Sequence, residues 1–263
     1  LDMALGTNGY LLKEERLEDI LPALTYLRFN ISAAEADKYA AIHVCKKECY
    51  FKIINTIKTC VKIKNEKNLD VTIGLQMILL PEVVDQVILL SNLGKKLGVD
   101  YLVIKHCSDD ERGTLGVDYS KYNDMVDILK EAETYSDNKY LVRAKWSKIL
   151  SGGSRNYTRC YGPPFIIQFS GSGLVAPCGM LFNDRYKKYH IGNIIDTPFK
   201  KIWQGDRYWE VINLIASEKF DAKTMCGSLC LQHKVNECLW AIKHENAVLK
   251  KEDFSPPAHI NFI

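Results

Sequence analysis

Residues 160–178 read CYGPPFIIQFSGSGLVAPC, and this stretch decides how the second half of the chain is built. Two short apolar runs, residues 165–169 and 174–176, flank a Ser-Gly-Ser-Gly turn, which predicts a β-hairpin. A cysteine lies just outside each arm, at Cys160 and at Cys178. The hairpin is therefore expected to bring two thiols close together.

Two further cysteines follow downstream. Cys226 and Cys230 lie on one loop or helical turn, and Gly227 between them lets the backbone approach a bulky group. The two pairs together offer four thiolates, a set that suits either zinc or an iron–sulfur cluster. The spacing fits both and does not choose between them. Cys238 is a candidate fifth ligand, although a lone cysteine is by default a buried apolar residue.

Composition narrows the class of protein. The chain of 263 residues holds nine cysteines, an odd number, and no leader segment opens it, so ligand thiols of a cytoplasmic protein are favoured over disulfides. The net charge of +3 is too small to indicate a nucleic-acid partner. No apolar run reaches the roughly 20 residues that a membrane-spanning helix needs, so no membrane partner is expected.

The first 150 residues alternate between apolar strands and charged helices. The helices are expected near residues 13–23, up to residue 61, from Pro81 to Gly98 and over 121–135. Such alternation predicts an α/β fold with a parallel sheet and helices outside it. The predicted strands are residues 2–7, 24–31, 69–79, 99–106 and 140–146.

A Ser-Gly-Gly-Ser run marks a change of composition after residue 150. We therefore expect a first domain over residues 1–150, a cysteine-rich domain over 151–245 and a tail over 246–263. One aromatic helix is predicted within the second domain, over residues 199–217.

Polar side chains follow several of the predicted strands. In parallel α/β sheets the chemistry gathers at the carboxyl ends of the strands, so these side chains predict a cleft without naming a reaction. The side chains at these ends are Thr7, Asn8, Ser32, Gln76, Lys105 and His106.

The spacing Cys160-x12-Gly173-x4-Cys178, followed after a gap by Cys226 and Cys230, resembles the SPASM/twitch extension found behind many radical S-adenosylmethionine (SAM) barrels. The stretches 192–194 (GNI) and 202–203 (IW) are similar to the sequence between the cysteine blocks of that extension. The full SPASM form uses seven cysteines for two auxiliary 4Fe-4S clusters. Four or five cysteines resemble the shorter twitch form, which implies one cluster.

The upstream half carries the same resemblance, which covers about residues 1–240. Residues 7–9 (TNG) look like the end of the third strand of a radical SAM barrel, and residues 29–32 (FNIS) look like the fourth strand. Residues 71–76 and 102–106 would be strands five and six. The resemblance implies a partial (β/α)6 barrel, strands three to six, followed by a small α+β domain with a β-hairpin.

The motifs of the first two barrel strands are missing from this sequence. The family's CxxxCxxC motif and its glycine-rich SAM motif do not occur in the chain. The resemblance implies an N-terminally truncated chain, with about 60–90 residues and a second 4Fe-4S cluster in the missing part. The catalytic residues are then unknown, and this fragment alone is expected to be inactive.

In the family, the radical-generating cluster cleaves SAM to a 5′-deoxyadenosyl radical, which removes a hydrogen atom from the substrate. The resemblance therefore implies an oxidoreductase or modifying enzyme, with an auxiliary cluster that assists electron transfer or substrate binding. It also implies an electron donor such as flavodoxin or ferredoxin. The substrate is a peptide or a small molecule, and one-cluster spacing slightly favours the small molecule. The implied cofactor contacts are Thr7, Asn8, Ser32, Gln76, Lys105 and His106 for SAM, and Cys160, Cys178, Cys226 and Cys230 for the auxiliary cluster, with Cys238 as the candidate extra ligand.

Two other functions remain open. The cysteine-rich part could be a non-catalytic binding module in which zinc or an iron–sulfur cluster only stabilises the fold. It could also be a peptide-binding domain that recruits substrate without chemistry. Metal analysis separates the first from the enzyme, and SAM cleavage by the full-length protein separates the second.

Overall fold

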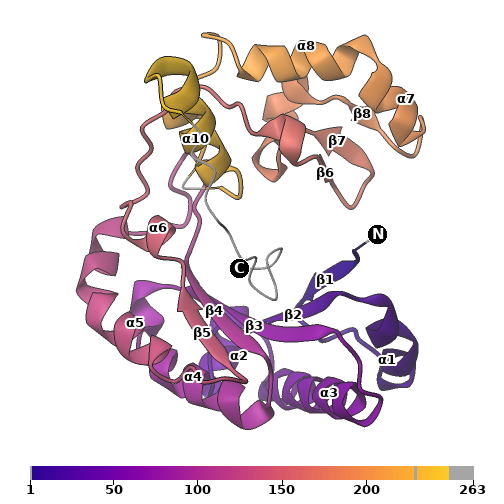
Figure 1. The fold of residues 1–263 in the computed structure, drawn as a ribbon, viewed down its shortest axis with the longest axis vertical. Coiled ribbons are helices and arrows are strands. Elements are labelled where there is room, and N and C mark those ends of the chain that lie inside the picture. The colour runs from indigo at the N-terminus through magenta and orange to yellow at the C-terminus, as the bar shows by residue number, and fades with distance from the viewer. Residues whose placement is uncertain (1, 228–229, 249–263) are drawn as a thin grey trace. The chain divides into compact units, whose positions relative to one another are not determined.

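The computed structural model describes residues 2–227 and 230–248, and these divide into two compact units (Figure 1). The first unit contains residues 2–107 and 118–152. The second contains residues 153–248 together with the loop 108–117. Each unit is described by itself.

The first unit is built on a five-stranded parallel sheet with the strands in sequence order. All five predicted strands are present, so the predicted α/β class is confirmed. The strands are β1 (Ala4–Thr7), β2 (Tyr26–Asn30), β3 (Thr72–Leu79), β4 (Tyr101–His106) and β5 (Leu141–Ala144).

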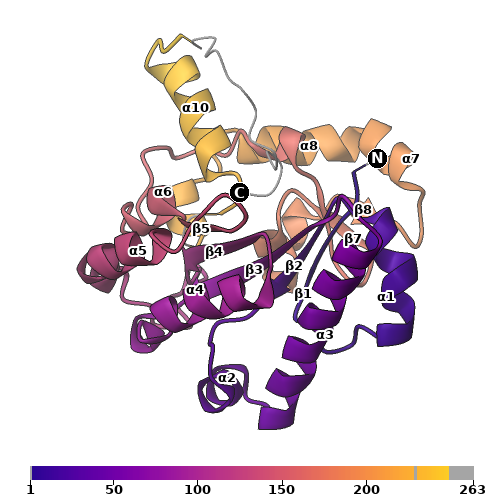
Figure 2. The same ribbon diagram turned by 60° about the horizontal axis from the view of Figure 1, so that its bottom comes forward.

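The helices of this unit lie on one face of the sheet (Figures 1 and 2). Right-handed crossovers between strands in sequence order place successive helices on the same side. The helices are α1 (Glu14–Ile20), η1 (Leu21–Ala23), α2 (Ala36–His43), α3 (Lys47–Glu66), η2 (Pro81–Val83), α4 (Gln86–Leu97), η3 (Tyr119–Met125), α5 (Val126–Glu133) and α6 (Trp146–Ile149).

Local sequence signals explain the ends of α4. Pro81 begins the 3-10 turn that leads into it, where a missing N–H costs nothing. Gly98 ends it in the left-handed conformation with φ of 74°, as the sequence predicted. Because Gly94 has no side chain, the Tyr140 ring packs against this helix and its hydroxyl donates to the carbonyl of Ser91 at 3.0 Å. These contacts fix α4 against the last strand of the sheet.

The two faces of the sheet differ in character because successive strand residues point to opposite sides. The outer face, packed by the helices, carries apolar residues that are almost completely buried, such as Phe29, Leu75 and Ile104. The inner face carries the alternate residues and is largely polar. The cross-strand register aligns its members in rows, which include Gly6, Arg28, Asn30, Gly74, Gln76, Tyr101, Lys105 and Arg143.

The second unit contains a three-stranded antiparallel sheet of order β6-β7-β8. The predicted hairpin is confirmed: β6 (Gln168–Phe169) pairs with β7 (Leu174–Ala176), and Gly173 takes φ of 79° at the turn. The third strand, β8 (Gly192–Asn193), was not predicted because two residues carry no periodicity.

The helices around this sheet correct one prediction. Residues 199–217 do not form one helix: α7 (Phe199–Gln204) and α8 (Asp206–Ile215) are separated at Gly205, which is extended with ψ of 156°. Glycine is a poor helix former, and it gains freedom by leaving the helix. The remaining helices are η4 (Pro163–Phe165), η5 (Gly179–Leu181), η6 (Asp184–Tyr189), α9 (Ala222–Met225) and α10 (His233–His244).

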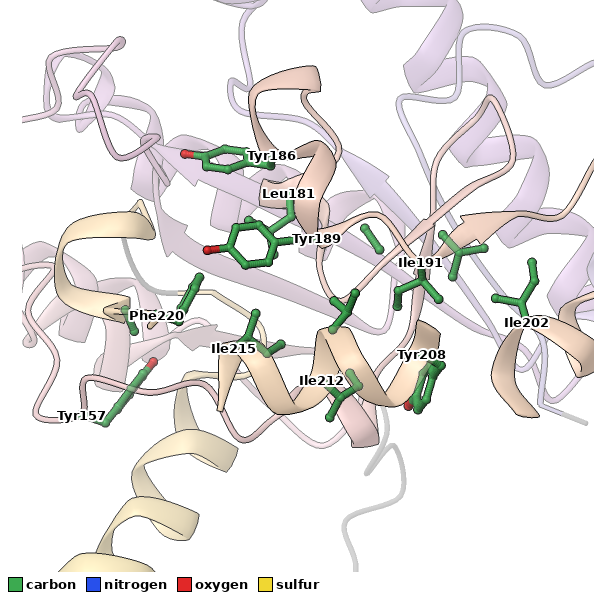
Figure 3. Close-up of a cluster of buried hydrophobic side chains, with 14 residues drawn as sticks. Tyr157, Leu181, Tyr186, Tyr189, Ile191, Ile202, Tyr208, Ile212, Ile215 and Phe220 are labelled. Carbon is green, nitrogen blue, oxygen red and sulfur yellow. The ribbon is translucent and has the colours of Figure 1, made fainter. Parts of the chain in front are cut away.

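A separate hydrophobic core holds the second unit together (Figure 3). One side of α8 points Tyr208, Ile212 and Ile215 into it, against Tyr189 and Ile191. The loop 108–117 joins this unit through an ion pair of 2.6 Å between Arg185 and Glu111.

None of the described helices is both long enough and apolar enough to cross a membrane.

Candidate cluster and cofactor sites

The four predicted ligand thiols come from four separate places in the second unit. Cys160 precedes η4, Cys178 follows β7, Cys226 ends α9 and Cys230 precedes α10. All four are half-buried. Three of them, Cys160, Cys178 and Cys226, pack against the core of Figure 3. The fold thus holds these thiols at the border between the core and the rest of the unit.

The four thiols lie close together, as the ionisation of three of them shows. Burial raises the pKa of the Cys160 thiol to about 11, and raises the pKa of Cys178 and of Cys226 to about 12. The neighbouring thiols, Cys230 among them, raise each of these three pKa values further. Every pair within the set of four interacts in this way, so the fold brings all four together.

Hydrogen bonds are directed at two of the sulfurs. The Asn236 side chain donates to Cys160 Sγ at 3.4 Å, and the backbone N–H of Gly162 also lowers the pKa of that thiol. Backbone N–H groups of Met180 and Leu181 lower the pKa of Cys178. Hydrogen bonds to sulfur stabilise the thiolate form, which is the form that binds metal.

Asn236 also holds the backbone at the first cysteine. Its side-chain oxygen accepts from the N–H groups of Tyr161 at 2.6 Å and Gly162 at 3.0 Å. Gln232, one turn earlier, accepts from Cys160 Sγ at 3.6 Å. Helix α10 therefore positions Cys160 through two amide side chains that the sequence alone did not single out.

Arg155 fastens the loop that carries Cys226. Its guanidinium donates to the carbonyl oxygens of Ala222 and Gly227, on either side of that cysteine. The same positive charge lowers the pKa of Cys226 and of Cys160. Arg155 thus provides a cation beside a site where thiolates would concentrate negative charge.

Gly227 is required by close packing. A Cβ atom at this position would lie 2.1 Å from the carbonyl oxygen of Asp109 and 2.8 Å from Asp110 Cα. The close neighbour of Gly227 is the backbone of the 108–117 loop, and the expectation that this glycine lets the backbone approach a bulky group stays a prediction.

No group of three or more His, Cys, Asp or Glu side chains within residues 2–227 and 230–248 is gathered tightly enough to hold a single metal ion. Four thiolates around one zinc ion would have sulfurs roughly 3.8 Å apart, from a Zn–S distance of about 2.3 Å. The four thiols lie near one another, but they are not drawn together tightly enough to surround one ion. Cys238, the candidate fifth ligand, is exposed on α10.

The residues predicted to contact SAM lie on both faces of the first unit's sheet. Gln76 and Lys105 are on the inner face, and Gln76 donates to Asn30 on the neighbouring strand at 2.9 Å. Ser32 is buried just past β2, where its hydroxyl accepts from the N–H of Ile78 at 3.3 Å. Asn8 is exposed just past β1.

Thr7 and His106 lie on the outer face instead. In the register, Thr7 pairs with Phe29 and His106 pairs with Leu79, both of which face the helices. Burial lowers the pKa of His106, and the Tyr122 ring lies 5.8 Å from its ring. Because neighbouring strand residues alternate, Lys105 and His106 cannot both point to the inner face.

The Thr7-Asn8-Gly9 turn is held by its own side chains. Thr7 Oγ1 accepts from the N–H of Gly9 at 3.0 Å, and Asn8 Oδ1 accepts from the N–H of Tyr10 at 3.1 Å. Gly9 has φ of 78° and lies against the Phe29 ring, where a Cβ atom would be only 2.8 Å away. The turn therefore has a structural reason for its glycine.

Comparison with known proteins finds a family match within the second unit. Residues 160–231 match the family described as SPASM, an iron–sulfur cluster-binding domain. No curated protein sequence matches the chain.

Solved structures share the fold at low sequence identity. Streptococcus suis SuiB bound to S-adenosylmethionine has a TM-score of 0.59 at 11% identity, over 81% of this chain and 51% of SuiB. SuiB bound to the precursor peptide SuiA gives 0.57 at 10%, over 82% and 50%. Native anSMEcpe with bound AdoMet gives 0.51 at 16%, over 86% of this chain and 64% of anSMEcpe.

This chain therefore spans between half and two thirds of the length of these structures. The resemblance read from the sequence is confirmed: the chain shares its fold with these radical SAM enzymes, and residues 160–231 match the SPASM family.

Proposed function

We propose that this chain is part of a radical SAM oxidoreductase or modifying enzyme, and that Cys160, Cys178, Cys226 and Cys230 hold an auxiliary 4Fe-4S cluster. One observation carries the proposal: Cys160, Cys178 and Cys226, whose pKa values are raised by neighbouring thiols that include Cys230, lie with Cys230 within the residues that match an iron–sulfur cluster-binding domain.

The match to an iron–sulfur cluster-binding domain favours a cluster over a zinc ion, because four sulfur donors alone suit either. The thiols share one environment, yet they are not gathered for a single ion. The competing function, a binding module stabilised by zinc, requires the four sulfurs to lie close enough to bind one ion.

The chain's own residues prepare this site. Asn236 donates to Cys160 Sγ, and the N–H groups of Gly162, Met180 and Leu181 lower the pKa of Cys160 and Cys178, which favours the thiolate form. Arg155 offsets part of the charge and fixes the loop of Cys226. The core of Figure 3 excludes water from one side.

We further propose that SAM binds at the inner face of the first unit's sheet. Gln76 and Lys105 are on that face, with Ser32 and Asn8 at the adjoining strand ends. Thr7 and His106 support these strand ends from the outer face. When bound, SAM and its reducing cluster supply a radical that removes a hydrogen atom from the substrate, and the auxiliary cluster supplies or accepts one electron.

No catalytic residue is assigned in this chain, because the CxxxCxxC spacing of the family does not occur in it. We propose that the second, radical-generating cluster belongs to another part of the protein, and that residues 1–263 alone do not turn over. An electron donor of the flavodoxin or ferredoxin kind would reduce the clusters. SuiB, which has been solved with a precursor peptide, supports a peptide substrate. The spacing typical of one cluster slightly favours a small molecule instead.

The test is anaerobic reconstitution with iron and sulfide. We expect a broad absorption band near 400 nm that is lost in Cys178→Ala and kept in the matched control Cys49→Ala, whose thiol lies in the first unit. A colourless protein, or equal absorption in both variants, would contradict the assignment.

A further inference from the structure

Positive charge gathers on the inner face of the first unit's sheet. The register places Arg28 of β2, Lys105 of β4 and Arg143 of β5 on this face. Lys145 follows β5 and continues the ladder, since its N–H donates to the carbonyl of Ile104 at 2.8 Å. Lys105 and Lys145 are therefore next to each other on adjoining strands.

These cations lack counter-ions. Among the described residues, none of Arg28, Lys105, Arg143 and Lys145 forms an ion pair with a carboxylate. Burial lowers the pKa of Lys105 to about 8, and the neighbours that lower it further, Lys148, Arg28 and Lys145, are all positive. Burial and the same kind of neighbours lower the pKa of Lys145.

Two buried hydrogen-bond donors in this group of side chains have no acceptor among the described residues. Arg28 Nε and Tyr101 Oη are both buried without a hydrogen-bond partner among the described residues, and Tyr101 is only 3% exposed. The positive charge of Arg28 acts on the Tyr101 hydroxyl, which shows that the two groups are neighbours. A buried donor without an acceptor destabilises the fold, so these two donors favour a bound acceptor.

The sheet makes room for both side chains. The register runs Gly6, Arg28, Gly74, Tyr101 across four strands. The Arg28 guanidinium lies over Gly6, 3.3 Å from where a Cβ atom would be, and the Tyr101 ring lies over Gly74, where a Cβ atom would be 2.1 Å away. Two glycines thus allow the donors to lie flat across the inner face.

An anion bound at this face would neutralise these cations and accept from the two donors that lack a partner. SAM does not: its single carboxylate is outweighed by an ammonium and a sulfonium group, so it adds a net positive charge. A carboxylate from the substrate would balance one cation of four. A phosphate carries about two negative charges and several acceptor oxygens, which better matches two lysines, an arginine and a tyrosine hydroxyl.

We propose that the inner face binds a phosphate or diphosphate group of the substrate, held by Arg28, Lys145 and the Tyr101 hydroxyl, beside Lys105 of the proposed SAM site and with Arg143 at the rim. That this anion belongs to the substrate rests on the proposed function, whereas the anion site itself does not. The guanidinium supplies paired donors, and the two ammonium groups act as point charges.

The test is calorimetric titration of the full chain with pyrophosphate, which requires neither cluster nor SAM. We expect binding that weakens at least about tenfold in Arg28→Met and Lys145→Met, and that is kept in Lys105→Arg. The matched control is Lys58→Met, an exposed lysine on α3, which should bind as the wild type does. Without pyrophosphate, Arg28→Met should raise the melting temperature, because it removes an unpaired cation; a merely structural arginine would lower it.

Three results would overturn the inference: no binding of pyrophosphate, equal loss in Lys58→Met, or citrate binding as tightly as pyrophosphate, which would indicate a carboxylate ligand. The iron–sulfur assignment is independent of all three, since it is read from absorption at 400 nm. A colourless protein that still binds pyrophosphate would refute the proposed function and retain the anion site.

Discussion

Replacing Gly227 with alanine should disrupt the candidate cluster site through packing alone. The added Cβ atom would lie 2.1 Å from the carbonyl oxygen of Asp109, against an ordinary contact of at least 3.4 Å, so the two backbones must separate by about 1.3 Å. Asp110 Cα and Met180 Cε would each be 2.8 Å away. Two of these three atoms belong to the backbone and cannot rotate aside.

Overpacking costs roughly 1–3 kcal/mol, and a rigid backbone neighbour places this variant in the upper half of that range, at about 2–3 kcal/mol. At roughly 2–4 °C for each kcal/mol, the melting temperature should fall by about 4–12 °C. Moving Gly227 also displaces the carbonyl that Arg155 holds and the adjacent Cys226. Iron incorporation should therefore fall as well.

The assay is thermal and denaturant unfolding of the metal-free chain, followed by anaerobic reconstitution. Gly171→Ala is the matched control, because nothing lies within 4 Å of a Cβ atom there and its φ is not positive. That variant should unfold within about 0.5 kcal/mol of the wild type and bind the same amount of iron. If Gly227→Ala matches Gly171→Ala in both stability and iron content, Gly227 does not lie against the backbone of Asp109 as described.

Three further predictions concern single residues. Burial places the pKa of Lys105 at about 8 in the folded chain against 10.5 unfolded, so wild-type stability should rise with pH between those values. Lys105→Met should remove that slope and be more stable at pH 7 by about 1–3 kcal/mol in denaturant titrations; an unchanged slope would show that the amine is solvated. Asn236→Ala should lose about 1–3 kcal/mol and release iron faster, because two backbone N–H groups and Cys160 Sγ lose their partner; unaltered iron release would argue against a role at the site. Val44→Gly should stabilise the chain by about 1 kcal/mol, since Val44 ends α2 with φ of 49° and is 92% exposed; a loss of stability would mean that this end of α2 is not left-handed.

The sequence predicted the first unit's sheet well because its signals are local. Apolar runs bounded by turns marked all five strands, and Pro81 and Gly98 marked the ends of the helical segment that contains α4. Where the signal was shorter, the prediction failed. Strand β8 has two residues, and one glycine, Gly205, was enough to divide the predicted helix of residues 199–217.

The candidate sites were only partly predictable. The spacing of the four cysteines was enough to mark them as candidate ligands. Arg155 and Asn236 act on this site from distant positions in the sequence, and no sequence pattern marks such contacts. The loop 108–117 packs in the second unit through contacts that only the folded chain defines. Strand register, not residue type, separates Lys105 on the inner face from its neighbour His106.

The central claim is that the four thiols of the second unit hold an iron–sulfur cluster. Metal and acid-labile sulfide analysis of the anaerobically reconstituted chain tests it most directly. The account predicts about four iron and four sulfide per chain with no zinc, all lost together when Cys226 is replaced by alanine. About one zinc per chain without sulfide would contradict it and identify a stapled binding module instead.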